Sequence, residues 1–489
     1  MKKNENRFET TTPAIEKTSH WIKDISQIID ADFATISKFI TAYQKDNPSI
    51  NPTIINEVVT RLQSLKDREI GVIRLLAGEL DVNEVADIFE RINSKGVPLN
   101  QADFAMSKLA AATGNGVYVR KIIDYFTHIL QEPSFYDQIN INDQNFTNAG
   151  LLGKISWAKD YVGTIYTPDY GDIVRTAFTY GFKRGKLSDL VALLSGRNFE
   201  TRNYEQDIAE QTTKLLMASV LDFIDHGHFT DFVQIIDSTG FIDAKLIGSK
   251  NALNYTYAIF LLLKKNKCNP SDIKKYVSKW FVMSVLTSRY SASPESAIDR
   301  DIKEISRIGI AEYLANQEPT EEYWNTTLLN DFDKASMQHP YLNTFFAAQV
   351  FFGENGFLGS VSLRSIREIK GDVHHVFPYE YLKSNGKNDR FEYNQIANFV
   401  YMEKSTNIQI GKLCPKDYME IVSKQARTRK LDKKHPIGKV TDETLLNDNL
   451  RQNCIPASFE KMDVNDYGRY LSERRKLMVK KIENYYKAL

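Results

Sequence analysis

The segment Gly371-Asp372-Val373-His374-His375-Val376-Phe377-Pro378 places two adjacent histidines in a short apolar run that a proline ends. A second apolar run, 398–403, follows after a polar loop, and Asn407 stands nine residues beyond Asn398. Short apolar runs bounded by glycine, proline and polar residues are typical of strands. The pattern predicts two strands followed by a helix that begins near Asn407.

The two histidines of this segment are expected to have different roles, because neighbouring side chains on a strand point to opposite faces. Hydrolysis of a phosphodiester needs a base for water, a cation near the phosphorus and stabilisation of the leaving 3′ oxygen. A histidine with a near-neutral pKa suits the first task, and a divalent ion held by two protein groups suits the others. His374, His375, Asn398 and Asn407 are therefore candidates for a one-metal hydrolytic site.

These residues resemble the HNH branch of the His-Me finger nucleases, whose fold is a β-hairpin packed on a helix around one metal ion. The resemblance implies that His375 is the general base and that Asn398 holds this base in place. It implies that His374 and Asn407 bind the metal. Asn394, four residues before Asn398, is a further candidate for a supporting role.

The sequence departs from that family at His374, where an acidic ligand is common. Two neutral ligands bind Mg²⁺ less tightly than a carboxylate does, and imidazole favours later transition metals. The expected cofactor is a divalent ion, Mg²⁺, Mn²⁺ or Ni²⁺, with higher activity in Mn²⁺ or Ni²⁺.

A second resemblance concerns segments outside the histidine motif. Residues 88–99, Ile-Phe-Glu-Arg-Ile-Asn-Ser-Lys-Gly-Val-Pro-Leu, resemble the Phe-x-x-x-Asn-x-x-Gly-x-x-Leu segment of GmrSD-type type IV restriction proteins. Residues 289–295 and 467–475 are also similar to that group. In this family a ParB/sulfiredoxin-like, nucleotide-dependent domain precedes a helical region and a C-terminal HNH nuclease. The resemblance implies restriction of foreign DNA, including modified phage DNA.

One family motif is missing from this chain. The nucleotide-dependent domain carries Asp-Gly-Gln-Gln-Arg, and no such stretch occurs between Met1 and Phe89. The front of that domain is therefore expected to be truncated, encoded separately or diverged. Nucleotide hydrolysis is not expected of this polypeptide alone, and a second subunit or a homo-oligomer is an expected partner.

The predicted fold class is mainly α, with a small C-terminal ββα-metal nuclease module. Four parts are expected along the chain. These are a partial ParB/sulfiredoxin-like domain at 1–112, a helical linker or specificity region at 113–340, the HNH nuclease at 341–440 and a helical extension at 441–489 that packs on the nuclease.

Composition limits the class of protein. The chain is 42% hydrophobic and 26% charged, which is ordinary for a globular protein. Three scattered cysteines indicate neither a disulfide framework nor a thiolate zinc site. The N-terminus lacks the apolar core of a secretory signal, and the most apolar run, 258–263, is too short to cross a bilayer. A cytoplasmic location without a membrane partner is expected.

Positive charge is concentrated after the histidine motif. Residues 411–489 hold 18 Lys or Arg and 11 Asp or Glu, whereas residues 1–410 hold 45 and 51. A basic segment of this kind is either a solvated surface or a contact for a polyanion such as DNA. The candidate phosphate contacts are Lys412, Lys424, Arg427, Arg429 and Lys430.

Two other groups of polar residues attract attention. His226 and His228 have no third ligand nearby in the sequence, so a helix end with exposed histidines is favoured over a metal site. Asp299 and Asp301 lie beside Arg300 and basic residues of the next turn, which favours surface ion pairs.

Two alternatives to a nuclease remain open. The chain can be a catalytically inactive DNA-binding or complex-forming subunit that needs a partner with the missing N-terminal motif. A structural scaffold with the histidines in a zinc site is a further alternative, which predicts bound zinc and unfolding by a chelator.

Overall fold

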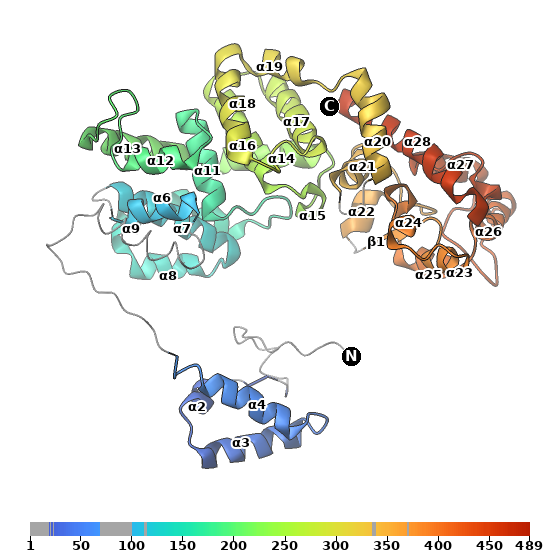
Figure 1. The fold of residues 1–489 in the computed structure, drawn as a ribbon, viewed down its shortest axis with the longest axis horizontal. Coiled ribbons are helices and arrows are strands. Elements are labelled where there is room, and N and C mark those ends of the chain that lie inside the picture. The colour runs from blue at the N-terminus through green and yellow to red at the C-terminus, as the bar shows by residue number, and fades with distance from the viewer. Residues whose placement is uncertain are drawn as a thin grey trace. The chain divides into compact units, whose positions relative to one another are not determined.

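The computed structural model describes residues 19, 21–22, 24–68, 100–111, 115–334, 339–368 and 371–489 (Figure 1). Helices account for 69% and strands for 3%, which confirms the predicted mainly α class. The chain forms two compact units, Met1–Leu80 and Asp81–Leu489. Segment 88–99, which carries part of the second resemblance, lies outside the described residues. In the described part of the chain, no helix is both long and apolar enough to cross a membrane.

The first unit has a small core of its own, made by Ile28, Ile55, Val59 and Leu62. Asn51 caps one of its helices, because its side chain accepts a hydrogen bond from the Thr53 amide at the helix start. The helices are α2 (Ser26–Ile29), α3 (Phe33–Asp46) and α4 (Pro52–Gln63).

The second unit begins with a long helical region. Its helices are α6 (Gln101–Ala111), α7 (Asn115–Gln131), α8 (Phe135–Asn142), α9 (Gln144–Asn148), α10 (Leu151–Lys154), α11 (Tyr170–Phe182), α12 (Leu187–Leu194), α13 (Gln206–Phe223), α14 (His226–Ser238), α15 (Ala244–Ile247), α16 (Lys250–Lys265), α17 (Pro270–Leu286), α18 (Pro294–Ile308), α19 (Ile310–Gln317) and α20 (Leu328–Lys334). Short 3₁₀ and π turns lie at η1 (Ser156–Asp160) and η2 (Tyr323–Thr327).

The breaks between these helices follow from capping residues in the sequence. The Asn100 side chain accepts hydrogen bonds from the amides of Ala102 and Asp103 and so caps the start of α6. Asp169 and Asp172 form a capping box at the start of α11. The apolar run at 258–263 lies inside α16 and is buried in the core.

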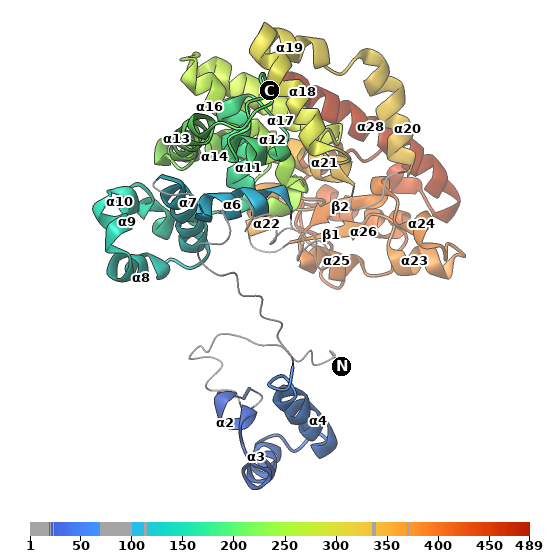
Figure 2. The same cartoon turned by 60° about the vertical axis from the view of Figure 1, so that its left-hand side comes forward.

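The C-terminal part of the second unit contains the two described strands. Its elements are α21 (Pro340–Phe351), α22 (Leu363–Glu368), β1 (Asp372–His375), α23 (Tyr379–Ser384), α24 (Arg390–Tyr393), η3 (Ile396–Asn398), β2 (Phe399–Met402), α25 (Lys404–Ile410), α26 (Pro415–Thr428), α27 (Glu443–Gln452), η4 (Phe459–Lys461), η5 (Val464–Asp466) and α28 (Tyr467–Ala488). Figure 2 shows β1 and β2 side by side, with α25 and α26 next to them.

The last helix, α28, packs against α17, α20 and α21. Tyr470, Arg474 and Met478 share one face of this helix and are fully buried. This face of α28 therefore packs into the core of the second unit.

Candidate functional site

The two histidines lie on β1, which pairs antiparallel with β2. His374 is opposite Val400, and His375 is opposite Phe399. Because residues opposite each other share a face and neighbours alternate, the two imidazoles lie on opposite faces of the strand pair. β1, β2 and α25 follow one another in the predicted order, and α25 begins two residues after β2 ends. The prediction of a polar loop between the strands is wrong, because this segment forms α23, α24 and η3.

His375 lies in an aromatic environment. Its ring centroid is 4.7 Å from that of Phe399 and 6.3 Å from those of Tyr379 and Tyr393. Burial lowers the pKa of this imidazole, and a hydrogen bond with Asn394 opposes the shift. The ring is therefore favoured in its neutral form, which is the form a general base requires.

The side chain that forms a hydrogen bond with the His375 ring is that of Asn394. Its Oδ1 lies 2.9 Å from Nε2 of His375. With Oδ1 as the acceptor, Nε2 carries the proton and Nδ1 keeps its lone pair. The residue that was a secondary candidate in the sequence is thus the direct partner of the imidazole.

Asn398 acts on the backbone that follows the histidines. Its Oδ1 accepts a hydrogen bond from the Phe377 amide at 2.8 Å, and its Nδ2 donates to the carbonyls of Phe377 and Tyr393 at 3.2 Å. The Val376 amide also donates to the Asn398 carbonyl at 2.7 Å. Asn398 is fully buried. It fixes the chain after His375 through these bonds, and its amide does not bond to the ring.

The proposed metal ligands lie on β1 and α25. His374 is half-buried on β1, and Asn407 is half-buried in the first half of α25. Among the described residues, no three His, Cys, Asp or Glu side chains gather as metal ligands. His374 and Asn407 would supply a neutral imidazole nitrogen and an amide oxygen, and the remaining ligands would come from water and phosphate.

The candidate phosphate contacts are all exposed. Lys424 and Arg427 lie on α26, Lys412 precedes this helix, and Arg429 and Lys430 follow it. The opposite face of α26 is buried, and the Tyr418 hydroxyl on that face donates to the Val376 carbonyl at 2.9 Å. The basic helix is therefore anchored directly to the residue after His375.

The structure also shows where the histidine pair at 226 and 228 and the aspartate pair at 299 and 301 lie. His226 and His228 lie in the first turn of α14, where the His226 ring stacks on Trp157 at 5.0 Å. The expectation of surface ion pairs is wrong for Asp301, which is fully buried. Arg289, twelve residues earlier, donates two bonds of 2.7 Å to this carboxylate. The sequence signal was obscured by the exposed basic neighbours of Asp301.

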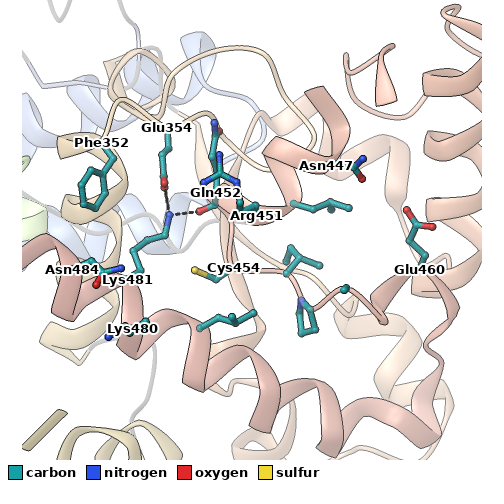
Figure 3. Close-up of a pocket in the computed structure, with 15 residues that line it drawn as sticks. Phe352, Glu354, Asn447, Arg451, Gln452, Cys454, Glu460, Lys480, Lys481 and Asn484 are labelled. Atoms are coloured by element: carbon teal, nitrogen blue, oxygen red, sulfur yellow. Dashed lines mark hydrogen bonds and ion pairs between the residues drawn. The ribbon is translucent and has the colours of Figure 1, made fainter. Parts of the chain in front are cut away.

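A pocket of about 800 Å³ lies between α27 and α28, and none of the residues predicted for the site lines it (Figure 3). Its wall includes an ion pair between Lys481 and Glu354, and Lys481 also donates to the Gln452 carbonyl at 2.7 Å. Burial raises the pKa of the Cys454 thiol to about 11, so this cysteine is protonated and is a poor nucleophile.

Comparison with known proteins adds no assigned activity. No protein-family model matches the chain, and no solved structure matches it. The chain is similar to MJ0686, an uncharacterized protein of Methanocaldococcus jannaschii, with 23% identity over 461 residues. The similarity covers 91% of this chain and 69% of that protein.

Proposed function

We propose that the chain is a metal-dependent endonuclease of the HNH type that hydrolyses phosphodiester bonds in DNA. The observation that carries this proposal is the hydrogen bond between His375 and Asn394, at the end of β1 in a strand–strand–helix arrangement. A half-buried imidazole with one nitrogen bonded and a lowered pKa suits a general base. The finer ββα-metal class of this module is part of the proposal.

The residues of the chain would divide the work as follows. Nδ1 of His375 would take a proton from the attacking water while Asn394 keeps the ring oriented. Asn398 would keep the 376–377 backbone in place beside it. His374 and Asn407 would hold a divalent ion, which supplies charge stabilisation for the phosphate and the leaving oxygen.

The basic surface of α26 supports DNA as the substrate. Lys412, Lys424, Arg427, Arg429 and Lys430 would contact phosphates on either side of the scissile bond. The resemblance of some segments to GmrSD-type proteins supports restriction of foreign DNA, including modified phage DNA, as the proposed role. A partner subunit would then supply the nucleotide-dependent front of the system.

The decisive experiment compares His375→Ala with His128→Ala on plasmid DNA in Mn²⁺. His128 is an exposed histidine on α7 and serves as the matched control. Loss of a general base is expected to lower cleavage at least about 100-fold, with DNA affinity and folding retained. Equal cleavage by the two variants would refute the assignment of His375. Tight, salt-sensitive binding without any cleavage by the wild type would favour a non-catalytic DNA-binding subunit.

A further inference from the structure

The helix α28 is hydrogen-bonded to the segment that carries both asparagines of the candidate site. The Tyr467 hydroxyl donates to the Glu392 carbonyl at 3.0 Å. Arg475 donates to the Gln395 side chain at 2.8 Å. These contacts lie on either side of Asn394, which bonds to His375.

Arg474 of the same helix holds the other end of this segment. Its Nη1 donates to the carbonyls of Ala397 at 2.7 Å and Phe399 at 2.8 Å, which flank Asn398. Its Nη2 donates to the Asn453 carbonyl at 3.1 Å. The residue is fully buried, and no carboxylate of the described residues forms an ion pair with it.

A buried guanidinium without a carboxylate costs free energy, because a charge leaves water without a compensating opposite charge. Backbone carbonyls offset this cost only while they stay in their present geometry. Arg474 therefore favours one conformation of the chain around Asn398. Both asparagines lie between residues that α28 binds.

We propose that Tyr467 and Arg474 are positioning residues for the candidate site, an inference that rests on the proposed nuclease function. They hold segment 392–399 so that Asn394 faces His375 and Asn398 faces Phe377. The C-terminal helix thus acts on the chemistry through the two asparagines and touches no reacting atom.

The chain offers a matched pair of variants. Tyr467→Phe removes a buried hydroxyl that bonds to the Glu392 carbonyl, and Tyr485→Phe removes one from the same helix that bonds to the Thr239 carbonyl at 2.6 Å. Both residues are almost fully buried. The two substitutions are expected to lower the free energy of unfolding by similar amounts. A different effect on segment 374–399 would therefore come from where each hydroxyl binds and not from general destabilisation.

The first measurement is amide hydrogen exchange of the full chain without metal or DNA. Tyr467→Phe is expected to speed exchange of peptides spanning 374–399 about fivefold, the effect of losing one hydrogen bond. Tyr485→Phe should leave these peptides unchanged and speed exchange near Thr239. Equal behaviour of the two variants at 374–399 would overturn the inference.

The second measurement is the kinetics of cleavage. Because positioning affects the reacting geometry, Tyr467→Phe should lower kcat about fivefold with KM unchanged. Arg474→Met should lower kcat about 100-fold, the cost of a misplaced catalytic group, and Arg474→Lys should recover part of this loss. A rise in KM with constant kcat would contradict positioning. If the wild type does not cut DNA but the contrast in exchange persists, the nuclease function fails and the positioning contacts stand.

Discussion

Two buried carboxylates of the helical region are satisfied differently from two buried asparagines in the C-terminal part of the second unit. In the helical region, the fully buried Asp301 accepts bonds from Arg289, Tyr290 and Tyr313. The nearly buried Asp172 pairs with Lys250 at 2.7 Å and accepts a bond from Asn254. These are contacts between side chains of different elements, with Arg289 and Tyr290 in the loop between α17 and α18.

In the C-terminal part, several buried side chains bond instead to backbone groups of connecting segments. Asn398 binds the Phe377 amide and carbonyl, and Asn449 binds the amide of Leu358 at 2.8 Å and the carbonyls of Gly356 and Gly359. Side chains that bind each other fasten helices together, whereas side chains that bind backbone fix the course of a loop. The second arrangement is the one that a site built on loops and short strands requires.

The largest effect is expected for Asp301→Ala. Removing one partner of a buried ion pair leaves the Arg289 charge without compensation, which should lower the free energy of unfolding by about 3–5 kcal/mol. Glu304→Ala, in an exposed pair with Arg307, should leave the urea midpoint unchanged. Cleavage by the remaining folded Asp301→Ala molecules should equal that of the wild type. A change in their cleavage would show that the ion pair in the helical region also affects the candidate site.

A smaller loss of stability is expected for Asn398→Ala, with a large effect on cleavage. The buried Phe377 amide loses its acceptor, which should cost about 2 kcal/mol of unfolding free energy. The control is Asn449→Ala, which also frees a buried amide, that of Leu358. Similar urea midpoints, with cleavage per folded molecule lost only in Asn398→Ala, would show that Asn398 acts on the site beyond its effect on stability. Equal cleavage by both would mean that Asn398 has only a structural role.

The sequence predicted the elements of the site because their signals are local. A short apolar run ended by Pro378 predicted β1, and a second apolar run predicted β2. The face of each histidine followed from strand alternation. The domain boundaries, the metal and the DNA contacts remain predictions.

Contacts that depend on how turns and distant segments meet in the folded chain could not be predicted in this way. The 3₁₀ turn η3 ends at Asn398, and the sequence does not show that Asn394, before this turn, is the asparagine that bonds to the imidazole. The Ala397 carbonyl that Arg474 binds lies 77 residues away from it in the sequence. A backbone carbonyl is present at every residue, so no pattern of side chains marks which ones an arginine will bind.

The two regions should also differ in their response to pH. Asp143 in the helical region accepts bonds from Lys121 at 2.6 Å and Tyr125 at 2.8 Å. Burial alone would raise the pKa of Asp143, but these bonds lower it below its usual value. A carboxylate with a lowered folded pKa contributes stability above its unfolded pKa of about 3.9, and this contribution is lost as pH falls through the folded value.

The urea midpoint of Asp143→Asn should therefore lie below that of the wild type at pH 6, and the difference should shrink as the pH falls toward about 3. The deficit of Asn449→Ala should stay constant over the same range, because amide and backbone groups do not titrate there. A constant deficit for Asp143→Asn would show that its bonds do not depend on charge.

The smallest effect is expected on the exposed basic surface. Arg427 is exposed on α26 and forms no ion pair with a described carboxylate, so Arg427→Ala should not change stability. If it contacts one phosphate, DNA affinity should fall a few-fold at every sequence, and the slope of log affinity against log salt should decrease by about 1. The matched control is Lys159→Ala on the helical region, which should leave that slope unchanged. Equal slopes for the two variants would mean that Arg427 does not contact a phosphate. The side chain–backbone contacts around His375 do not depend on Arg427, so the geometry for cleavage would be the same in that case.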